Sequence, residues 1–221
     1  MEIREVVKGR RSIRKYKPDK VSENIIREII EDARWAPSGG NTQPWELNVV
    51  TGESLRKFKE ANRRNFLEGV PAIPDLARQQ IWPEVMKNRY QTLAKNTLTS
   101  QNIDRKDREA RRQYNADMFA LFDAPCLILF CLDKALSLEY AMLDLGMILQ
   151  TVCSLAYDRG LGTCILAASI LYPHLAREIL SVPESKNVII GIALGYPDWE
   201  APVNNFKRER AELNEFVFWL K

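Results

Sequence analysis

Apolar positions recur with two different periods along this chain, and the periods distinguish helices from strands. After Ser22, a residue type common at helix N-caps, apolar residues recur every three or four positions from Ile25 to Ala33 and predict a helix. Similar but shorter patterns predict helices at residues 3–7 and around 55–61. Residues 45–49 instead alternate between apolar and polar side chains, which predicts a strand.

Two later segments are almost continuously apolar. Residues 126–132 follow a proline and predict a buried strand, whereas the longer segment 138–157 has helical spacing. Because apolar or small residues occupy the other faces of this helix too, we expect it to be buried nearly all round and to end at Arg159–Gly160. Further patterns predict strands at 162–166 and 187–194 and a helix at 174–180. This mixed order of elements predicts an α+β fold around one sheet.

Residues 63–115 differ from the rest of the chain. They are rich in Arg, Lys, Gln and Asn and lack long apolar runs. We interpret them as a helical insertion within a single domain of residues 1–221, with its charges on a solvated face. Trp82 and Tyr90 stand out in this insertion, either as substrate-stacking rings or, more simply, as residues packed against their own helices.

Composition narrows the possible functions. The 32 basic residues nearly balance 29 acidic ones, which argues against a nucleic-acid partner. We find no apolar run as long as a membrane span and no signal-peptide core at the charged N-terminus, so we expect no membrane partner and a cytoplasmic location. The four cysteines lack metal or redox spacing and are expected to be buried free thiols. A single histidine, His174, rules out a His-rich metal site and is expected on a helix surface.

Two basic segments are candidates for anion binding. Arginine offers planar, permanently charged donors and serine a small hydroxyl, which suit a phosphate group. Although the segments lie at opposite ends of the chain, they can converge on one anion; solvated turns are the alternative. The first comprises Arg10, Arg11, Ser12 and Arg14, and the second comprises Lys207, Arg208 and Arg210.

Two segments rich in small residues allow a flat ligand to approach the backbone closely. Each is explained equally well as an ordinary turn between a helix and a strand. The first spans residues 35–45 and offers Pro37, Ser38, Gly39, Asn41 and Gln43, and the second spans residues 160–168 and ends with Ile165, Leu166, Ala167 and Ala168.

Taken together, these segments resemble the nitroreductase family of FMN-dependent oxidoreductases. The matching motifs are Arg-Arg-Ser-Ile-Arg at 10–14, Ala-Pro-Ser-Gly-Gly-Asn-x-Gln-Pro-Trp at 36–45, Asp-Leu-Gly-Met at 144–147, Gly-Leu-Gly-Thr-Cys at 160–164 and Gly-Tyr-Pro at 195–197. The resemblance implies a mostly antiparallel central sheet flanked by helices. It also implies a homodimer with FMN at the interface and a C-terminal segment that extends onto the partner subunit.

The resemblance also implies roles for individual residues. Arg10 and Ser12, with Arg208 and Arg210, are expected at the FMN phosphate and ribityl chain, and Arg14 at the pyrimidine end of the ring. Arg11, Gln43 and Lys207 are further expected cofactor contacts. The partner subunit is expected to contribute residues 37–39 and Asn41. The backbone of residues 165–168 is expected to face the reactive N5 edge, although Ile and Leu stand at 165 and 166, where the family often has a polar residue or proline.

A flavin would explain the scarcity of histidine, because the cofactor itself carries hydride and needs no catalytic side chain. We therefore predict ping-pong transfer of hydride from NADH or NADPH to nitroaromatic, quinone or similar electron-poor acceptors. Two alternatives remain: reductive dehalogenation or flavin breakdown on the same fold, and a flavin-binding protein without turnover.

Overall fold

One antiparallel sheet organises the molecule in this computed structural model, which describes residues 1–77 and 79–220. The strand order is β1-β2-β4-β3, and every neighbouring pair is antiparallel. The strands are β1 (Trp45–Val50), β2 (Cys126–Asp133), β3 (Gly162–Leu166) and β4 (Lys186–Gly195), so all four predicted strands are confirmed. The α+β fold is confirmed with them.

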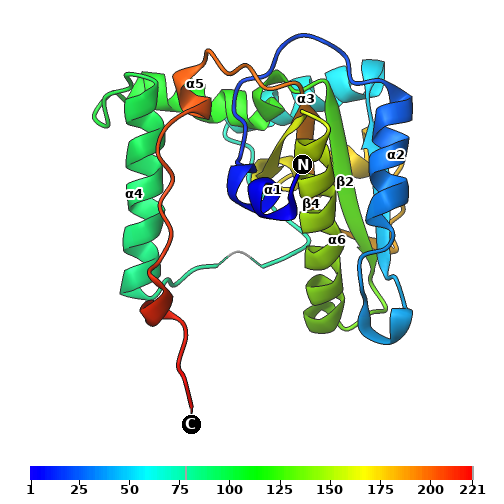
Figure 1. Cartoon of the computed structure of the whole chain (residues 1–221). Helices are drawn as coiled ribbons and strands as arrows, with labels where there is room; N and C mark the ends of the chain where they lie inside the picture. The colour runs from blue at the N-terminus through cyan, green and yellow to red at the C-terminus, as the bar shows by residue number, and fades with distance from the viewer. Residues whose placement is uncertain (78, 221) are drawn as a thin grey trace.

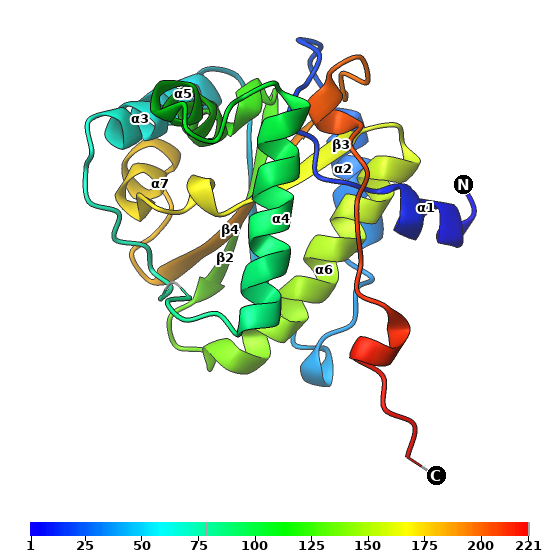
Figure 2. The ribbon, with the colours of Figure 1, turned by 90° about the vertical axis from the view of Figure 1, so that its left-hand side faces the viewer.

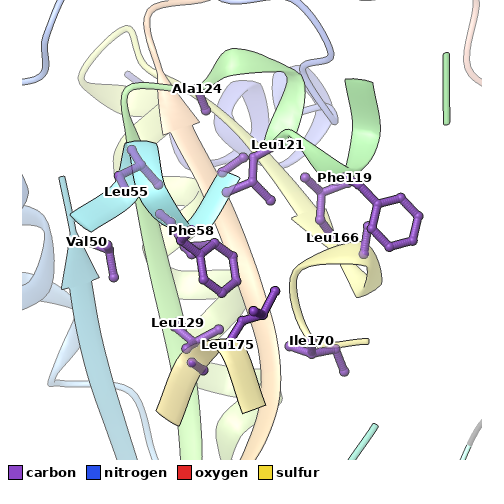
Figure 3. Packing of buried hydrophobic residues seen from close by; sticks show 14 of the residues in the cluster. Val50, Leu55, Phe58, Phe119, Leu121, Ala124, Leu129, Leu166, Ile170 and Leu175 are labelled. Carbon is purple, nitrogen blue, oxygen red and sulfur yellow. The ribbon is translucent and has the colours of Figure 1, made fainter. Parts of the chain in front are cut away.

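Helices cover both faces of this sheet (Figure 1). α2 (Glu23–Ala33) and α6 (Leu138–Asp158) pack on one face, and α3 (Gly52–Leu67), α5 (Arg108–Phe119) and α7 (Pro173–Leu180) pack on the other. The central strand β2 divides its side chains between the two cores, since successive residues of a strand point to opposite faces. Leu127, Leu129 and Cys131 join the α3 side, shown in Figure 3, and Cys126, Ile128, Phe130 and Leu132 join the α6 side.

Local signals at the helix ends act as the sequence predicts. The Ser22 hydroxyl accepts a hydrogen bond from the Ile25 backbone N–H at 3.3 Å and caps α2. Gly160 ends α6 with φ at +74°, in the left-handed region that glycine adopts at low cost. All four cysteines are buried and free, as predicted.

α6 departs from the sequence prediction in one respect. Its inner face is buried, but Tyr140 and Leu143 are 78% and 62% exposed, so the helix is not buried all round in a single chain. Among the described residues, α6 is also long and apolar enough to cross a membrane by length and composition alone. Its most apolar stretch of 18 residues has a mean hydropathy of 1.2, and 39% of that stretch is buried inside the molecule. Length and composition do not distinguish a spanning helix from the core helix of a globular protein.

The predicted insertion contains the end of α3, the whole of α4 (Glu84–Ser100) and most of α5. α5 packs against α3, whereas α4 buries only Thr97 among its own residues. α4 runs beside the C-terminal segment, which continues past it and projects from the body (Figures 1 and 2). The short helix α1 (Ile3–Gly9) packs against α6 near the N-terminus.

Candidate cofactor site

The first basic segment follows α1 and runs along the outer edge of β3. Ser12 forms a parallel bridge with Thr163, and the Ile13 backbone N–H donates to the Thr163 carbonyl at 2.9 Å. Ile13 is almost completely buried, at 1% exposed. Because alternate residues of an extended segment point in opposite directions, burial of Ile13 directs its neighbours Ser12 and Arg14 away from the core.

The second basic segment, near the C-terminus, is hydrogen-bonded to the first. The Arg208 guanidinium donates to the carbonyls of Lys8 and Arg10, at the C-terminal end of α1, where a cation is favoured by the helix dipole. In the opposite direction, the Arg11 guanidinium donates to the Phe206 carbonyl at 2.6 Å. The structure therefore brings together two segments that lie almost 200 residues apart in the sequence.

A cavity of about 680 Å³ lies between these segments and α4. Its lining includes every residue predicted in the two basic segments, together with a face of α4 that includes Asn88, Arg89 and Thr92. The predicted residues in the lining are Arg10, Arg11, Ser12, Arg14, Lys207, Arg208 and Arg210.

The electrostatics of this cavity favour an anion. Within residues 1–77 and 79–220, seven cationic side chains line it, against two carboxylates, Glu209 and Glu215. Burial, followed by the neighbouring cations Arg11, Arg210 and Arg10, lowers the pKa of Arg208. Burial also lowers the pKa of Arg11, with a further contribution from Arg14. Cations that destabilise one another in this way gain free energy when a negative group binds between them.

The small-residue loop at 37–43 lies elsewhere. None of Pro37, Ser38, Gly39, Asn41 and Gln43 lines the cavity. In Figure 1 the loop between α2 and β1 is at the lower right, whereas the C-terminal segment descends on the left. Within one chain, therefore, the predicted site residues form two separate groups.

This loop is nevertheless rigidly built. Gly40, Asn41 and Gln43 all have positive φ, at 57°, 56° and 48°, a conformation that costs free energy for residues other than glycine. The Ser38 hydroxyl accepts from the Gln43 N–H at 3.0 Å. Asp144 of α6, only 7% exposed, accepts from the Gly39 N–H at 3.0 Å and fixes the loop to the core.

The predicted backbone segment at 165–168 continues from β3 into a 3-10 turn, Ala167–Ser169. Ile165 and Ala167 are exposed, whereas Leu166 and Ala168 are buried. Because the Ser12–Thr163 bridge is parallel, the chain from Ser12 to Arg14 and the chain from Thr163 onward run in the same direction. The segment therefore begins directly after Cys164, whose thiol lies close enough to Arg14 and Ser12 to interact with both, although its residues do not line the cavity.

Sequence reasoning missed three polar residues that support these segments. Asn204, completely buried, accepts from the Arg14 backbone N–H and donates to the Lys15 carbonyl, both at 2.8 Å. Tyr114 of α5 lies beside Arg14; burial raises the pKa of its hydroxyl to about 12, and the Arg14 guanidinium acts in the opposite direction. Asp144 lay within a recognised motif, but nothing local marked Asn204 or Tyr114.

The two aromatic residues singled out in the insertion pair with each other. Trp82 and Tyr90 stack with ring centroids 6.2 Å apart and an interplanar angle of 17°. Tyr90 lines the cavity, and both rings are substantially exposed. His174 lies exposed on α7, as predicted.

A larger groove of about 1370 Å³ lies between α2 and α3, along the free edge of β1. Ile26, Ile30, Val49 and Leu55 form its apolar part, and lysine and arginine side chains also line it. None of the predicted cofactor residues lies in this groove.

Comparisons with known proteins agree with the fold. The nitroreductase family model matches residues 7–196, and the chain therefore belongs to the nitroreductase family. A 4-nitrobenzoate reductase of Pseudomonas putida is 32% identical over 97% of this chain and 94% of its own length.

Two solved structures of relatives are very similar in fold. The FMN- and NADPH-dependent nitroreductase NfnB of Sphigopyxis sp. strain HMH has a TM-score of 0.96 and 27% identity, with 100% of both chains covered. The FMN-dependent NfnB of Mycobacterium smegmatis, in complex with NADPH, has a TM-score of 0.93 and 27% identity over 99% of this chain and 97% of that one.

Proposed function

We propose that this protein is an FMN-dependent oxidoreductase that takes hydride from NADH or NADPH and reduces nitroaromatic, quinone or similar electron-poor acceptors. The observation that carries the proposal is the convergence of the two distant basic segments on one cavity, in a chain whose relatives include FMN-dependent nitroreductases. Donor and acceptor would bind in turn at the same place, which gives ping-pong kinetics.

The cationic cavity fits the phosphate end of FMN. The Arg10 Nε is buried and has no hydrogen-bond partner among the described residues, so it is available to a ligand. Arg10, Ser12, Arg208 and Arg210 would hold the phosphate and the ribityl chain, with Arg11 and Lys207 adding positive charge. Arginine suits this role because its planar donors match phosphate oxygens in pairs.

The residues beside β3 would hold the ring. Arg14 would sit at the pyrimidine end, oriented by the contact with Tyr114 and by the backbone bond to Asn204. The backbone at 165–168, in which Ile165 and Ala167 are exposed, would lie against the N5 edge. When bound, FMN supplies a two-electron carrier that exchanges hydride with nicotinamide and acceptor, which leaves the protein to bind, orient and tune it.

We further propose a homodimer in which the loop at 37–43 completes the site of the partner subunit. Two observations support this proposal: the loop is prearranged and exposed, and it lies away from the cavity of its own chain. The exposed apolar residues of α6, Tyr140, Met142 and Leu143, would form the subunit contact, because exposed apolar patches commonly mark interaction surfaces.

The C-terminal segment would extend onto the partner subunit. Phe216, Phe218, Trp219 and Leu220 are between 61% and 96% exposed, and the segment projects from the body (Figure 2). The groove between α2 and α3 would receive it, since β1 offers an unpaired strand edge there with apolar residues on either side. We place this dimer in the cytoplasm, in keeping with four free cysteines.

Anaerobic reduction of the purified protein tests the function. NADH or NADPH should bleach the visible absorbance of bound FMN, and 4-nitrobenzoate or a quinone should restore it. Double-reciprocal plots at several acceptor concentrations should run parallel. Intersecting plots would contradict the ping-pong mechanism, and a bound flavin that neither nicotinamide bleaches would indicate a binding protein without turnover.

A further inference from the structure

Asn62 is a polar residue in the middle of an apolar core. It lies on the inner face of α3, seven residues after Leu55 and four after Phe58, and it is completely buried. Its neighbours belong to the core between α3, α5, α7 and the sheet, which includes Phe119, Leu166 and Ile170 (Figure 3). An apolar side chain would fill this position without the free-energy cost of desolvating an amide.

The Asn62 side chain connects three elements. Its Nδ2 donates to the Phe119 carbonyl, at the end of α5, at 2.6 Å and to the Ala168 carbonyl, in the turn after β3, at 3.0 Å. Its Oδ1 is buried and has no hydrogen-bond partner among the described residues. The side-chain amide of Asn62 thus donates two hydrogen bonds to backbone carbonyls, whereas its oxygen accepts none from the residues that the structure describes. The two donated bonds are therefore what distinguishes asparagine from an apolar residue at this position.

The turn that Asn62 holds is the one proposed to face the flavin edge. Within the turn, Ile170 N–H donates to the Ala167 carbonyl at 3.1 Å, and the Ser169 hydroxyl donates to the Leu166 carbonyl at 2.6 Å. Ser169 packs directly against Gly191 of β4. A Cβ added at Gly191 would lie only 2.4 Å from the hydroxyl oxygen of Ser169. Two buried polar side chains therefore hold this turn, and Ala167 within it is exposed.

We propose that Asn62 is a positioning residue that fixes the Leu166–Ser169 turn against the proposed flavin and couples it to the end of α5. The proposal rests on the proposed function for its consequence in catalysis. The hydrogen bond from Asn62 to the Ala168 carbonyl holds the turn whether or not a cofactor is bound. Because α5 follows α4, which borders the cationic cavity, Asn62 also links the insertion to the reacting edge of the site.

Three measurements on the Asn62→Leu variant test this proposal. Loss of both donors should speed hydrogen exchange of the amides at 167–170 by about ten-fold in the purified protein. In the FMN-loaded protein it should slow hydride transfer from the nicotinamide by about five-fold, because the edge is no longer held in place. The dissociation constant of FMN should change by less than about three-fold, since the residues proposed to hold the phosphate are unchanged.

Asn62→Thr and Ile29→Ala serve as controls. Asn62→Thr keeps one hydroxyl donor and should give intermediate values, and it provides a second variant if Asn62→Leu does not fold. Ile29 is fully buried in the other core, on α2, so Ile29→Ala should lower the melting temperature without changing exchange at 167–170 or the rate of hydride transfer.

The results separate the two proposals. If both Asn62 variants lose thermal stability but keep wild-type exchange at 167–170 and wild-type hydride transfer, Asn62 is only a structural residue and the proposal is wrong. If the wild-type protein is not reduced by either nicotinamide, the proposed function fails, while the exchange measurement still decides whether Asn62 fixes the turn.

Discussion

At the scale of single residues, the arginines of the cationic cavity have different surroundings. Arg208 is half-buried and bonded to the carbonyls at the end of α1, so it serves both the cavity and the fold. Arg14 lies further along the extended segment, where Asn204 holds its backbone and Tyr114 lies beside its side chain. We therefore expect Arg208 at the phosphate end of the proposed cofactor and Arg14 at the ring.

These surroundings predict opposite effects for two substitutions. Arg14→Ala should lower the reduction potential of bound FMN, because a cation near the ring favours the added negative charge, and should weaken FMN binding only slightly. Arg208→Ala should weaken binding about ten-fold, the loss of one charge-assisted hydrogen bond, with little change in potential. Titration with FMN and a dye-linked redox titration measure the two quantities. Loss of FMN alone in both variants would contradict this division of roles.

At the scale of elements, an ion pair secures the connection between α3 and α4 to the sheet. The Asp75 carboxylate accepts from the Arg177 guanidinium of α7 at 3.0 Å and from the Val188 N–H of β4 at 2.8 Å. The two side chains are only 14% and 12% exposed. Asp75 therefore joins a connecting segment to a helix and a strand that are far away in the sequence.

Removal of Asp75 should cost much more stability than removal of a surface charge. Asp75→Ala should lower the free energy of unfolding by about 2 kcal/mol, because it leaves Arg177 with only the exposed Glu184 as its ionic partner in the described part of the chain and leaves the Val188 N–H unpaired. Glu23→Ala is the matched control. The Glu23 and Arg27 side chains are 82% and 73% exposed, so their ion pair should contribute less than about 0.5 kcal/mol to the free energy of unfolding. Urea unfolding of both variants compares them. Equal losses would show that the Asp75 pair does not secure the segment.

Strands β2 and β3 carry thiols whose ionisation is opposed by the core. Burial raises the pKa of Cys126 to about 12 and the pKa values of Cys131 and Cys164 to about 11. When folding raises the pKa of an acid, the free energy of unfolding is unaffected at pH values below the pKa of the unfolded state, which is near 9 for a thiol. The free energy of unfolding then decreases as the pH rises from that value toward the pKa of the folded state.

The protein should therefore lose stability in alkaline solution. Above about pH 9, each of these thiols should contribute a decrease of about 1.4 kcal/mol per pH unit in the free energy of unfolding. Urea unfolding between pH 8 and pH 10, roughly the window in which the unfolded thiols ionise, measures the slope. Cys126→Ala should start from a lower stability but show a shallower slope, and an unchanged slope would show that Cys126 does not contribute.

At the scale of the whole molecule, one chain leaves several apolar surfaces exposed. α6 exposes Tyr140 and Leu143, and the C-terminal segment exposes its aromatic residues. The loop at 37–43 is rigid and anchored by Asp144, yet lies away from the cationic cavity. A two-fold dimer would account for all three features, because it would bury the apolar surfaces and bring the loop of one subunit to the cavity of the other.

A charge on the exposed face of α6 should test this dimer. Leu143→Asp should convert the protein to a monomer and should abolish FMN binding, because the partner loop would no longer reach the cavity. Light scattering and the flavin absorbance of the purified protein measure the two effects. Ile73→Asp, at a position that is 76% exposed on the connection between α3 and α4, should remain dimeric and yellow. A monomeric Leu143→Asp variant that retains FMN would show that one chain suffices for the site.

Much of the fold could be predicted because its signals are local. The periodicity of apolar residues determined each strand and most helices, and Ser22 and Gly160 determined two helix ends within a few residues of themselves. The motifs of the family identified the basic segments, the small-residue loop and the backbone at 165–168. Neither the face of α6 left exposed nor the polar residue on the apolar face of α3 followed from periodicity, since a helical pattern does not say what covers each face.

Sequence alone thus determined the elements, the fold class and the kinds of residue available for the site, because these depend on neighbours along the chain. Only the tertiary structure decided that Arg10 and Arg208 border one cavity and that residues 37–43 do not reach it. It also decided that Asn62, Tyr114, Asp144 and Asn204 contact the segments proposed to form the site. The physical reason is that hydrogen bonds and mutual charge effects act over a few ångströms in space, and the packing of the helices on the sheet alone determines which distant residues come that close.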